Sequence, residues 1–165
     1  MSVRSLFRSV VMLSAITIAL PVAAQQRAAP QPPPRVITIT VTDPVAEKME
    51  YSMKQIVAKP GERLTVRLLS LAQTPKIVMA HNWVLLKLGT NVKPFLDAAA
   101  NARATDFIPT APALKGQILA DIGLVGPGER LDVTFTAPKV PGTYPYVCSF
   151  AGHYAAGMFG SLVVK

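Results

Sequence analysis

The stretch Cys148-Ser-Phe-Ala-Gly-His-Tyr-Ala-Ala-Gly-Met158 places a thiol, an imidazole and a thioether in one short segment. Thiolate and thioether sulfur stabilise Cu(I), and imidazole accepts either oxidation state of copper. A trigonal copper site with a weak axial methionine needs a second histidine, and the chain contains only one more, His81. The sequence therefore predicts a copper site built from His81, Cys148, His153 and Met158.

Each of these residues also has an ordinary explanation. A single cysteine is often a small buried hydrophobe, and a methionine often fills a gap in a core. A Cys148–His153 nucleophile of the protease type is a further alternative, but it gives Met158 no role, and its spacing matches no protease signature. A multicopper oxidase or reductase domain needs additional histidines, which the chain lacks. We therefore predict metal binding and no enzymatic activity.

The stretches His81-Asn-Trp-Val-Leu85, Cys148 to Met158 and Gly160-Ser-Leu-Val-Val-Lys165 resemble the azurins of the cupredoxin family, and the resemblance covers the chain from about Arg35 onward. It implies that His81, Cys148 and His153 are the strong ligands of one Cu(I)/Cu(II) ion and that Met158 is a weak axial ligand. Four residues separate His153 from Met158, as in the auracyanin branch, whereas azurins have three.

The resemblance also assigns supporting residues around these ligands. Ala80 stands where azurins have a glycine whose carbonyl lies near copper, so the Ala80 carbonyl is a candidate weak axial contact. Asn82 would tether the His81 loop to the Cys148 loop, and the Phe150 amide would donate to the Cys148 sulfur. The azurin disulfide cannot form here, because Cys148 is the only cysteine.

Short runs of alternating apolar residues, separated by turn signals, are typical of an all-β protein. Leu131, Val133 and Phe135 are expected to face inward, and Trp83 is expected to be a core residue. We expect a Greek-key sandwich or barrel with the four ligands at one end. The seven or eight predicted strands cover residues 35–42, 49–58, 63–68, 83–88, 118–125, 130–136, 143–147 and 159–165, and the second of them is interrupted between residues 53 and 55.

One segment breaks the strand pattern. Val92, Phe95, Leu96 and Ala99 recur at helical spacing, and Pro94 suits a first helical turn. The pattern predicts one short helix over residues 91–104, packed against the outside of the strands. Residues 109–116 are expected to be irregular.

Three segments are expected along the chain. Arg4 and Arg8 precede an apolar run that ends in Pro21-Val-Ala-Ala24, a pattern typical of a secretory signal peptide over residues 1–24. A transmembrane anchor is the alternative, but the run is shorter than the about 20 apolar residues that span a bilayer. Residues 25–34 form a proline-rich leader, and residues 35–165 form the copper-binding domain.

The predicted signal peptide indicates a periplasmic or otherwise exported protein, with no transmembrane anchor after cleavage. A free thiol is a liability in an oxidising compartment, and copper ligation by Cys148 removes that liability. The formal charge is +8, or +6 without Arg4 and Arg8. Such a charge balance is compatible with acidic partners or anionic membrane, but we interpret it first as a generally basic, solvated surface. Export and the absence of a Lys/Arg cluster disfavour nucleic acid.

We expect the protein to be a soluble monomer that carries single electrons between exported redox proteins, such as c-type cytochromes or a copper-accepting reductase or oxidase. Storage or delivery of copper is the alternative function, because it needs the same ligands. A carrier also needs an apolar docking face around a ligand edge. The residues expected to form this docking patch are Met49, Met79, Gly152, Tyr154 and Ala155.

Overall fold

The computed structural model describes residues 32–43 and 49–165. The predicted signal peptide, residues 1–24, and the leader up to residue 31 lie outside the described residues. The elements are β1 Arg35–Val41, β2 Gln55–Ala58, β3 Arg63–Ser70, β4 His81–Leu86, α1 Val92–Ala99, the 3-10 turn η1 Arg103–Thr105, α2 Pro112–Lys115, β5 Ile118–Val125, β6 Arg130–Thr136, β7 Gly142–Val147 and β8 Phe159–Val164.

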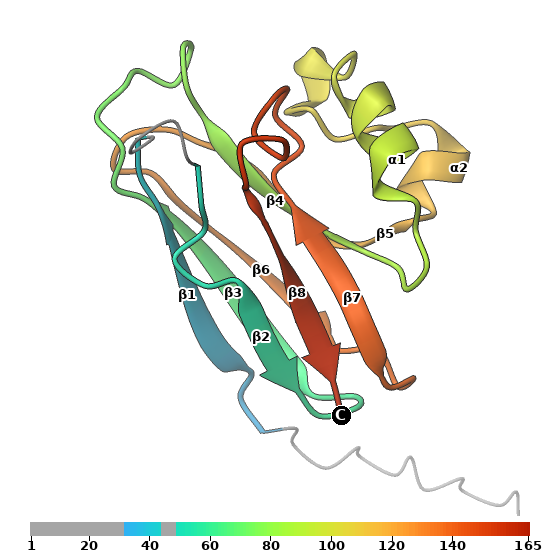
Figure 1. The fold of residues 1–165 in the computed structure, drawn as a ribbon. Coiled ribbons are helices and arrows are strands. Elements are labelled where there is room, and N and C mark those ends of the chain that lie inside the picture. Colours follow the sequence, from blue (N-terminus) through green and yellow to red (C-terminus); the bar gives the residue numbers. More distant parts are fainter. Residues whose placement is uncertain (1–31, 44–48) are drawn as a thin grey trace, which may run out of the picture. The chain divides into compact units, whose positions relative to one another are not determined.

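The strands form two sheets that pack face to face (Figure 1). The first sheet has the order β1-β3-β6, and the second has the order β2-β8-β7-β4-β5. β1 pairs with β3 in parallel, as β2 does with β8, and the remaining neighbours are antiparallel. This architecture confirms the predicted all-β sandwich.

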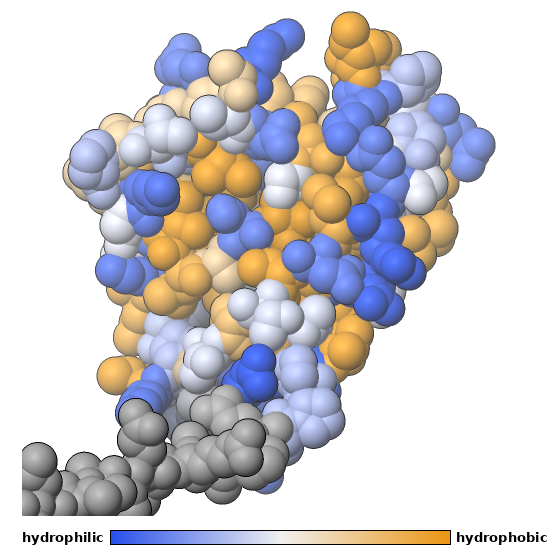
Figure 2. Space-filling view, turned by 180° about the vertical axis from the view of Figure 1, so that it is seen from behind, coloured by the Kyte–Doolittle hydropathy of each residue, from blue (hydrophilic) through white to orange (hydrophobic). Residues whose placement is uncertain are grey.

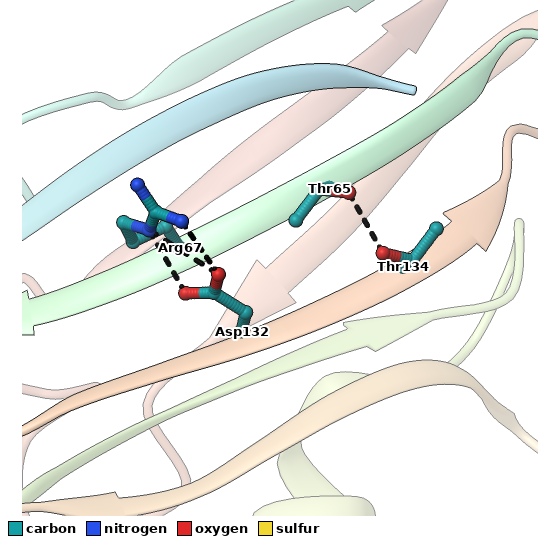
Figure 3. A network of polar contacts seen from close by, with 4 residues as sticks. All are labelled: Thr65, Arg67, Asp132 and Thr134. Atoms are coloured by element: carbon teal, nitrogen blue, oxygen red, sulfur yellow. Dashed lines mark hydrogen bonds and ion pairs between the residues drawn. The ribbon is translucent and has the colours of Figure 1, made fainter. Parts of the chain in front are cut away.

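The core between the sheets follows from the alternation of side chains along each strand. In β3, Leu64, Val66 and Leu68 are fully buried. The residues between them face away from the core: Thr65 bonds Thr134 at 2.7 Å, and Arg67 forms an ion pair with Asp132 at 2.8 Å (Figure 3). These cross-strand pairs fix the β3–β6 register on the outer face, where apolar burial does not specify it.

The inward residues of β6 differ in how far they are covered. Val133 and Phe135 pack partly buried against the core, as predicted. Leu131 lies opposite the buried Leu68, and therefore on the expected face, but it is 44% exposed. Leu131 therefore keeps the predicted face but is less covered than Val133 and Phe135 of the same edge strand.

β4 is buried along its whole length, because different parts of the molecule cover its two faces. Trp83 and Leu85 point into the core between the sheets, which confirms Trp83 as a core residue. Val84 and Leu86 form a second apolar cluster with Phe95 of α1. The helical insertion therefore packs on the outside of the sheet, as expected.

The bounds of several predicted elements are corrected. The helix expected over residues 91–104 ends at Ala99, and η1 follows it. Residues 112–115 are helical, not irregular, because Pro112 occupies the first turn, where its missing N–H costs no hydrogen bond. The strand expected over residues 49–58 is regular only from Gln55, since the Met49 amide bonds instead to Ala156 O at 3.2 Å.

β4 begins and ends two residues earlier than expected, at His81 and Leu86. Its first residue is therefore one of the predicted ligands. None of the helices in residues 32–43 and 49–165 combines the length and the apolar character needed to cross a membrane.

Candidate metal centre

The four predicted ligands come from three strand ends and one connecting segment that meet at one end of the sandwich. His81 begins β4, Cys148 directly follows β7, and Met158 directly precedes β8. His153 lies in the turns between β7 and β8. In Figure 1 this end is at the top, where the β7–β8 connection and the start of β4 lie. The expectation that the ligands gather at one end is met.

The donor atoms of these residues face one another. His81 Nδ1 lies 3.2 Å from Met158 Sδ, and Cys148 Sγ lies 3.4 Å from His153 Nδ1. The donor atoms of the two histidines and the cysteine all lie within 4.8 Å of each other. All four side chains are buried, and His153 is the most exposed at 3%.

Burial also sets the charge state of the imidazoles. It lowers the pKa of His81 from 6.5 to about 4, an effect that the charge of Asp43 opposes. Burial, followed by the charge of His81, lowers the pKa of His153 from 6.5 to about 4. Both rings are therefore neutral at pH 7, and each keeps a lone pair that can bind a metal.

Burial raises the pKa of the Cys148 thiol from 9.0 to about 11. Hydrogen bonds from the backbones of Asn82 and Phe150 and from the Tyr51 side chain oppose this rise, because they favour the thiolate. Donation from the Phe150 amide to a copper-bound Cys148 sulfur stays a prediction. A metal that binds Cys148 releases a proton, and these donors then stabilise the anionic sulfur.

This donor set fits copper. Two neutral imidazoles, one thiol and one thioether converge in a buried space, and this combination of soft sulfur and imidazole is the one that copper prefers. The second nitrogen of His81, Nε2, is buried and has no hydrogen-bond partner among the described residues. The other nitrogen, Nδ1, faces the thioether of Met158 in His81 and the thiol of Cys148 in His153.

Asn82 joins the two ligand segments through its side chain. Its Oδ1 accepts from the Ser149 amide at 2.8 Å, and its Nδ2 donates to Ser149 Oγ at 2.8 Å. Nδ2 also donates to the Asp106 carbonyl at 2.7 Å. The predicted tether thus links the residue after His81 to the residue after Cys148. Sequence reasoning missed Ser149, whose only signal was its place beside the cysteine.

An aromatic stack leads from the cluster toward the surface. The centroid of the Phe150 ring lies 4.4 Å from that of the His153 ring and 4.6 Å from that of the Phe107 ring. The Arg103 guanidinium lies 5.8 Å from the Phe107 ring centroid. Ala80 is fully buried beside His81, and axial contact by its carbonyl stays a prediction.

The residues predicted for docking surround the same end. Met49 and Met79 are half-buried, Gly152 and Ala155 are exposed, and Tyr154 is half-buried against Phe159. Met49 is joined to the ligand turns by its hydrogen bond to Ala156.

The β3–β4 loop adds two residues that sequence reasoning missed. Ile77 is 93% exposed and Val78 is 64% exposed. Figure 2 shows an apolar projection at the top of the molecule, the end at which this loop lies in Figure 1. An isoleucine followed by a valine, shortly before a predicted ligand, was the available signal for this apolar surface.

A model of copper-binding proteins of the plastocyanin/azurin family matches residues 38–165. Auracyanin-B of Chloroflexus aurantiacus is 39% identical over 100 residues, which are 61% of this chain and 42% of that protein. Azurin of Achromobacter denitrificans is 33% identical over 112 residues, which are 66% of this chain and 73% of that protein. The chain thus spans less than half the length of this auracyanin-B.

Solved structures of similar proteins share the fold. Reduced auracyanin from Roseiflexus castenholzii superposes with a TM-score of 0.64 at 32% identity, covering 78% of this chain and 96% of that chain. Auracyanin A of Chloroflexus aurantiacus, a "blue" copper protein, superposes with a TM-score of 0.64 at 29% identity, covering 79% of this chain and 99% of that chain. The family match includes all four candidate ligands.

Proposed function

Because the chain belongs to the plastocyanin/azurin family of copper-binding proteins, we propose that it carries single electrons between redox partners through one bound copper ion. In this proposal His81, Cys148 and His153 are the strong ligands and Met158 is the weak axial ligand. The Ala80 carbonyl is the candidate for a second, weaker axial contact.

One observation carries the proposal: four donor side chains, three from strand ends and one from the β7–β8 turns, are buried together. A bound copper ion supplies a one-electron couple. The chain contributes a site whose donors need to move little when the electron arrives or leaves. β4, β7 and β8 are hydrogen-bonded neighbours, and Asn82 ties two of their ends together.

The burial of the cluster favours a carrier over a protein that stores or delivers copper. A delivery protein needs an accessible site that releases its metal readily, whereas these four side chains are at most 3% exposed. Electron transfer needs only the approach of a partner to a ligand edge. His153, which lies in the turns at the end of the molecule, is the ligand that we assign to this role.

We propose that partners dock on the apolar surface around His153, here called the docking end. It comprises the predicted Met49, Met79, Gly152, Tyr154 and Ala155, together with Ile77 and Val78 of the β3–β4 loop. An apolar surface of this kind is typical of a protein–protein contact, and methionines adapt to several partners. An electron-transfer contact is expected to bury less than about 1,200 Å², so that release stays fast.

The setting of this reaction follows from the sequence. The predicted signal peptide over residues 1–24 supports our proposal that the protein acts in the periplasm or another exported location, and we propose separately that it is a monomer. Its partners would be exported redox proteins, such as c-type cytochromes or a copper-accepting reductase or oxidase. We propose neither enzymatic activity nor nucleic-acid binding.

Copper reconstitution followed by voltammetry and a chelator challenge tests this function. A carrier gives a rapid, reversible one-electron wave and keeps its copper in the presence of a weak chelator. Rapid loss of copper to the chelator, together with a sluggish wave, would favour storage or delivery instead.

A further inference from the structure

A pocket of about 410 Å³ opens beside the ligand turns, next to the docking end. Its lining includes residues 76–78 of the β3–β4 loop, Arg103 of η1, and the rings of Phe107 and Phe150. The β3–β4 loop and the segment around η1 both lie at the top of Figure 1, the end that carries the proposed ligands. The pocket therefore joins two segments that are far apart in the chain.

The inner wall of the pocket leads to a proposed ligand. The rings of Phe107, Phe150 and His153 are stacked in series, with successive centroids 4.6 and 4.4 Å apart. The Phe107 carbonyl also accepts a hydrogen bond from Ser149 Oγ at 2.6 Å, which ties this residue to the segment that follows Cys148. Two ring contacts thus separate a group seated in the pocket from His153.

Arg103 supplies a positive charge at the mouth of the pocket. The residue is exposed, and its guanidinium lies 5.8 Å from the centroid of the Phe107 ring, in a cation–π contact. Such a contact holds the planar guanidinium against the ring and leaves its N–H groups available to an acceptor. No carboxylate among residues 32–43 and 49–165 forms an ion pair with it.

Other charged groups beside the pocket are engaged in contacts of their own. The Lys76 ammonium is paired with the Glu129 carboxylate at 2.6 Å. Asp106, close to Arg103 in the sequence, accepts a hydrogen bond from the Leu124 amide at 3.2 Å. Within the part of the chain that the structure describes, Arg103 is therefore the charged residue of the pocket lining that has no counter-ion.

We propose that this pocket receives a carboxylate side chain of the redox partner, which pairs with Arg103 while apolar groups around it rest on Ile77 and Val78. This inference rests on the proposed electron-carrier function. A guanidinium binds a carboxylate through two parallel hydrogen bonds, so the contact fixes orientation as well as charge. It selects partners with an acidic, partly apolar docking face and sets how they lie relative to His153.

The test uses two forms of one partner: a lysine-rich c-type cytochrome, and the same cytochrome after succinylation of its lysines. Succinylation converts each ammonium into an amide that bears a carboxylate, so the haem is kept while the surface becomes acidic. One electron passes from ferrous haem to Cu(II), or in reverse from Cu(I) to ferric haem, and stopped-flow spectroscopy measures both rates for wild type and Arg103→Gln.

Arg63→Gln is the matched control for the loss of one positive charge. Arg63 is also exposed and has no ion pair among the described residues, but it begins β3 at the end of the sandwich opposite to His81. β3 is roughly 25 Å long. At about 0.1 M salt, charges are screened beyond about 10 Å, so the control reports effects that do not depend on place.

With the succinylated cytochrome, we expect Arg103→Gln to slow the exchange by about two- to fivefold, the effect of one exposed ion pair, and Arg63→Gln to leave it unchanged. With the unmodified cytochrome, Arg103→Gln should not slow the exchange, because a basic surface gains nothing from Arg103. The optical spectrum and the reduction potential of Arg103→Gln should equal those of wild type, so that a slower rate reports docking.

An unchanged rate in Arg103→Gln, an equal loss in Arg63→Gln, or an equal loss with both cytochromes would overturn the inference, as would a shifted potential in Arg103→Gln. A wild-type protein that takes up no copper, or that exchanges electrons with neither cytochrome, would instead refute the proposed carrier function itself.

Discussion

Met158 differs from the other proposed ligands in the chemistry of its donor atom. Its thioether lies 3.2 Å from His81 Nδ1 and is fully buried. A thioether is a weak donor to Cu(II), and a long axial bond of this kind tunes the potential without supplying the colour of the site. We expect the thiolate of Cys148 to supply that colour.

We therefore predict that Met158→Leu keeps the charge-transfer band and raises the reduction potential. Loss of a weak donor destabilises the oxidised state more than the reduced one. Voltammetry of the copper-loaded variant measures the change. Met49→Leu is the control, because Met49 is half-buried at the same end of the molecule and is not a proposed ligand. A lower potential in Met158→Leu would refute the axial assignment.

At the scale of elements, the hydrogen bonds between Asn82 and Ser149 connect the start of β4 to the segment after β7. We call these contacts the bridge. Asn82→Ala removes three hydrogen bonds, two to Ser149 and one to the Asp106 carbonyl. A buried polar group left without a partner costs about 1–3 kcal/mol. We predict that the free energy of unfolding falls by at least that amount and that copper dissociates faster.

Ser149→Ala provides a graded comparison for this bridge. It removes the hydroxyl but keeps the backbone amide that donates to Asn82 Oδ1. Copper loss in this variant should be intermediate between wild type and Asn82→Ala. Denaturant unfolding and chelator-driven copper release measure the two effects. Equal rates of copper release in all three proteins would show that the bridge does not hold the ligand segments.

The β3–β4 loop tests the docking end. Ile77 is almost fully exposed, so Ile77→Lys adds a charge without disturbing the core. We predict an unchanged optical spectrum and a markedly slower electron self-exchange rate at matched ionic strength. Val140→Lys is the control, because Val140 is 61% exposed in the turn before β7, away from the ligand end. The same rate in both variants would place docking elsewhere.

The elements that sequence reasoning located best are those in which apolar periodicity and burial agree. Ile37, Ile39 and Val41 alternate in the sequence, and all three are buried. The ligands could also be predicted from the sequence, because one cysteine and two histidines leave a single possible set of one thiolate and two imidazole ligands. Most residues of the candidate site could therefore be predicted from the composition and the residue spacing.

Features that depend on tertiary packing could not be predicted from the sequence in this way. Leu131 follows the alternation of β6 but lies at a sheet edge. Phe107 has a left-handed backbone, with φ of 59°, which a sequence pattern does not reveal for a non-glycine residue. Tyr51 and Ser149 contact the site only because segments far apart in the chain are folded together.

At the scale of the whole molecule, the buried imidazoles couple folding to pH. Their pKa values are about 4 in the folded protein, against a usual value of 6.5. Between these values the unfolded chain binds protons that the folded chain does not bind, so acidification favours unfolding. The metal-free protein should keep its full stability above pH 6.5 and lose it progressively toward pH 4.

Each imidazole accounts for at most about 3 kcal/mol of this loss. Urea unfolding of the metal-free protein between pH 7 and pH 4 measures it, and His153→Gln should reduce the pH dependence. A midpoint independent of pH over this range would mean that the imidazoles are not buried in their neutral form.

The central claim is that one copper ion binds where His81, Cys148, His153 and Met158 converge, and its most direct test is an optical spectrum. We predict that the Cu(II)-loaded protein is intensely coloured by thiolate-to-copper charge transfer and that Cys148→Ser abolishes this colour. Cys148 is the only thiol in the chain, so no other residue can supply the band. An uncoloured Cu(II) protein, or a spectrum that Cys148→Ser leaves unchanged, would contradict the account.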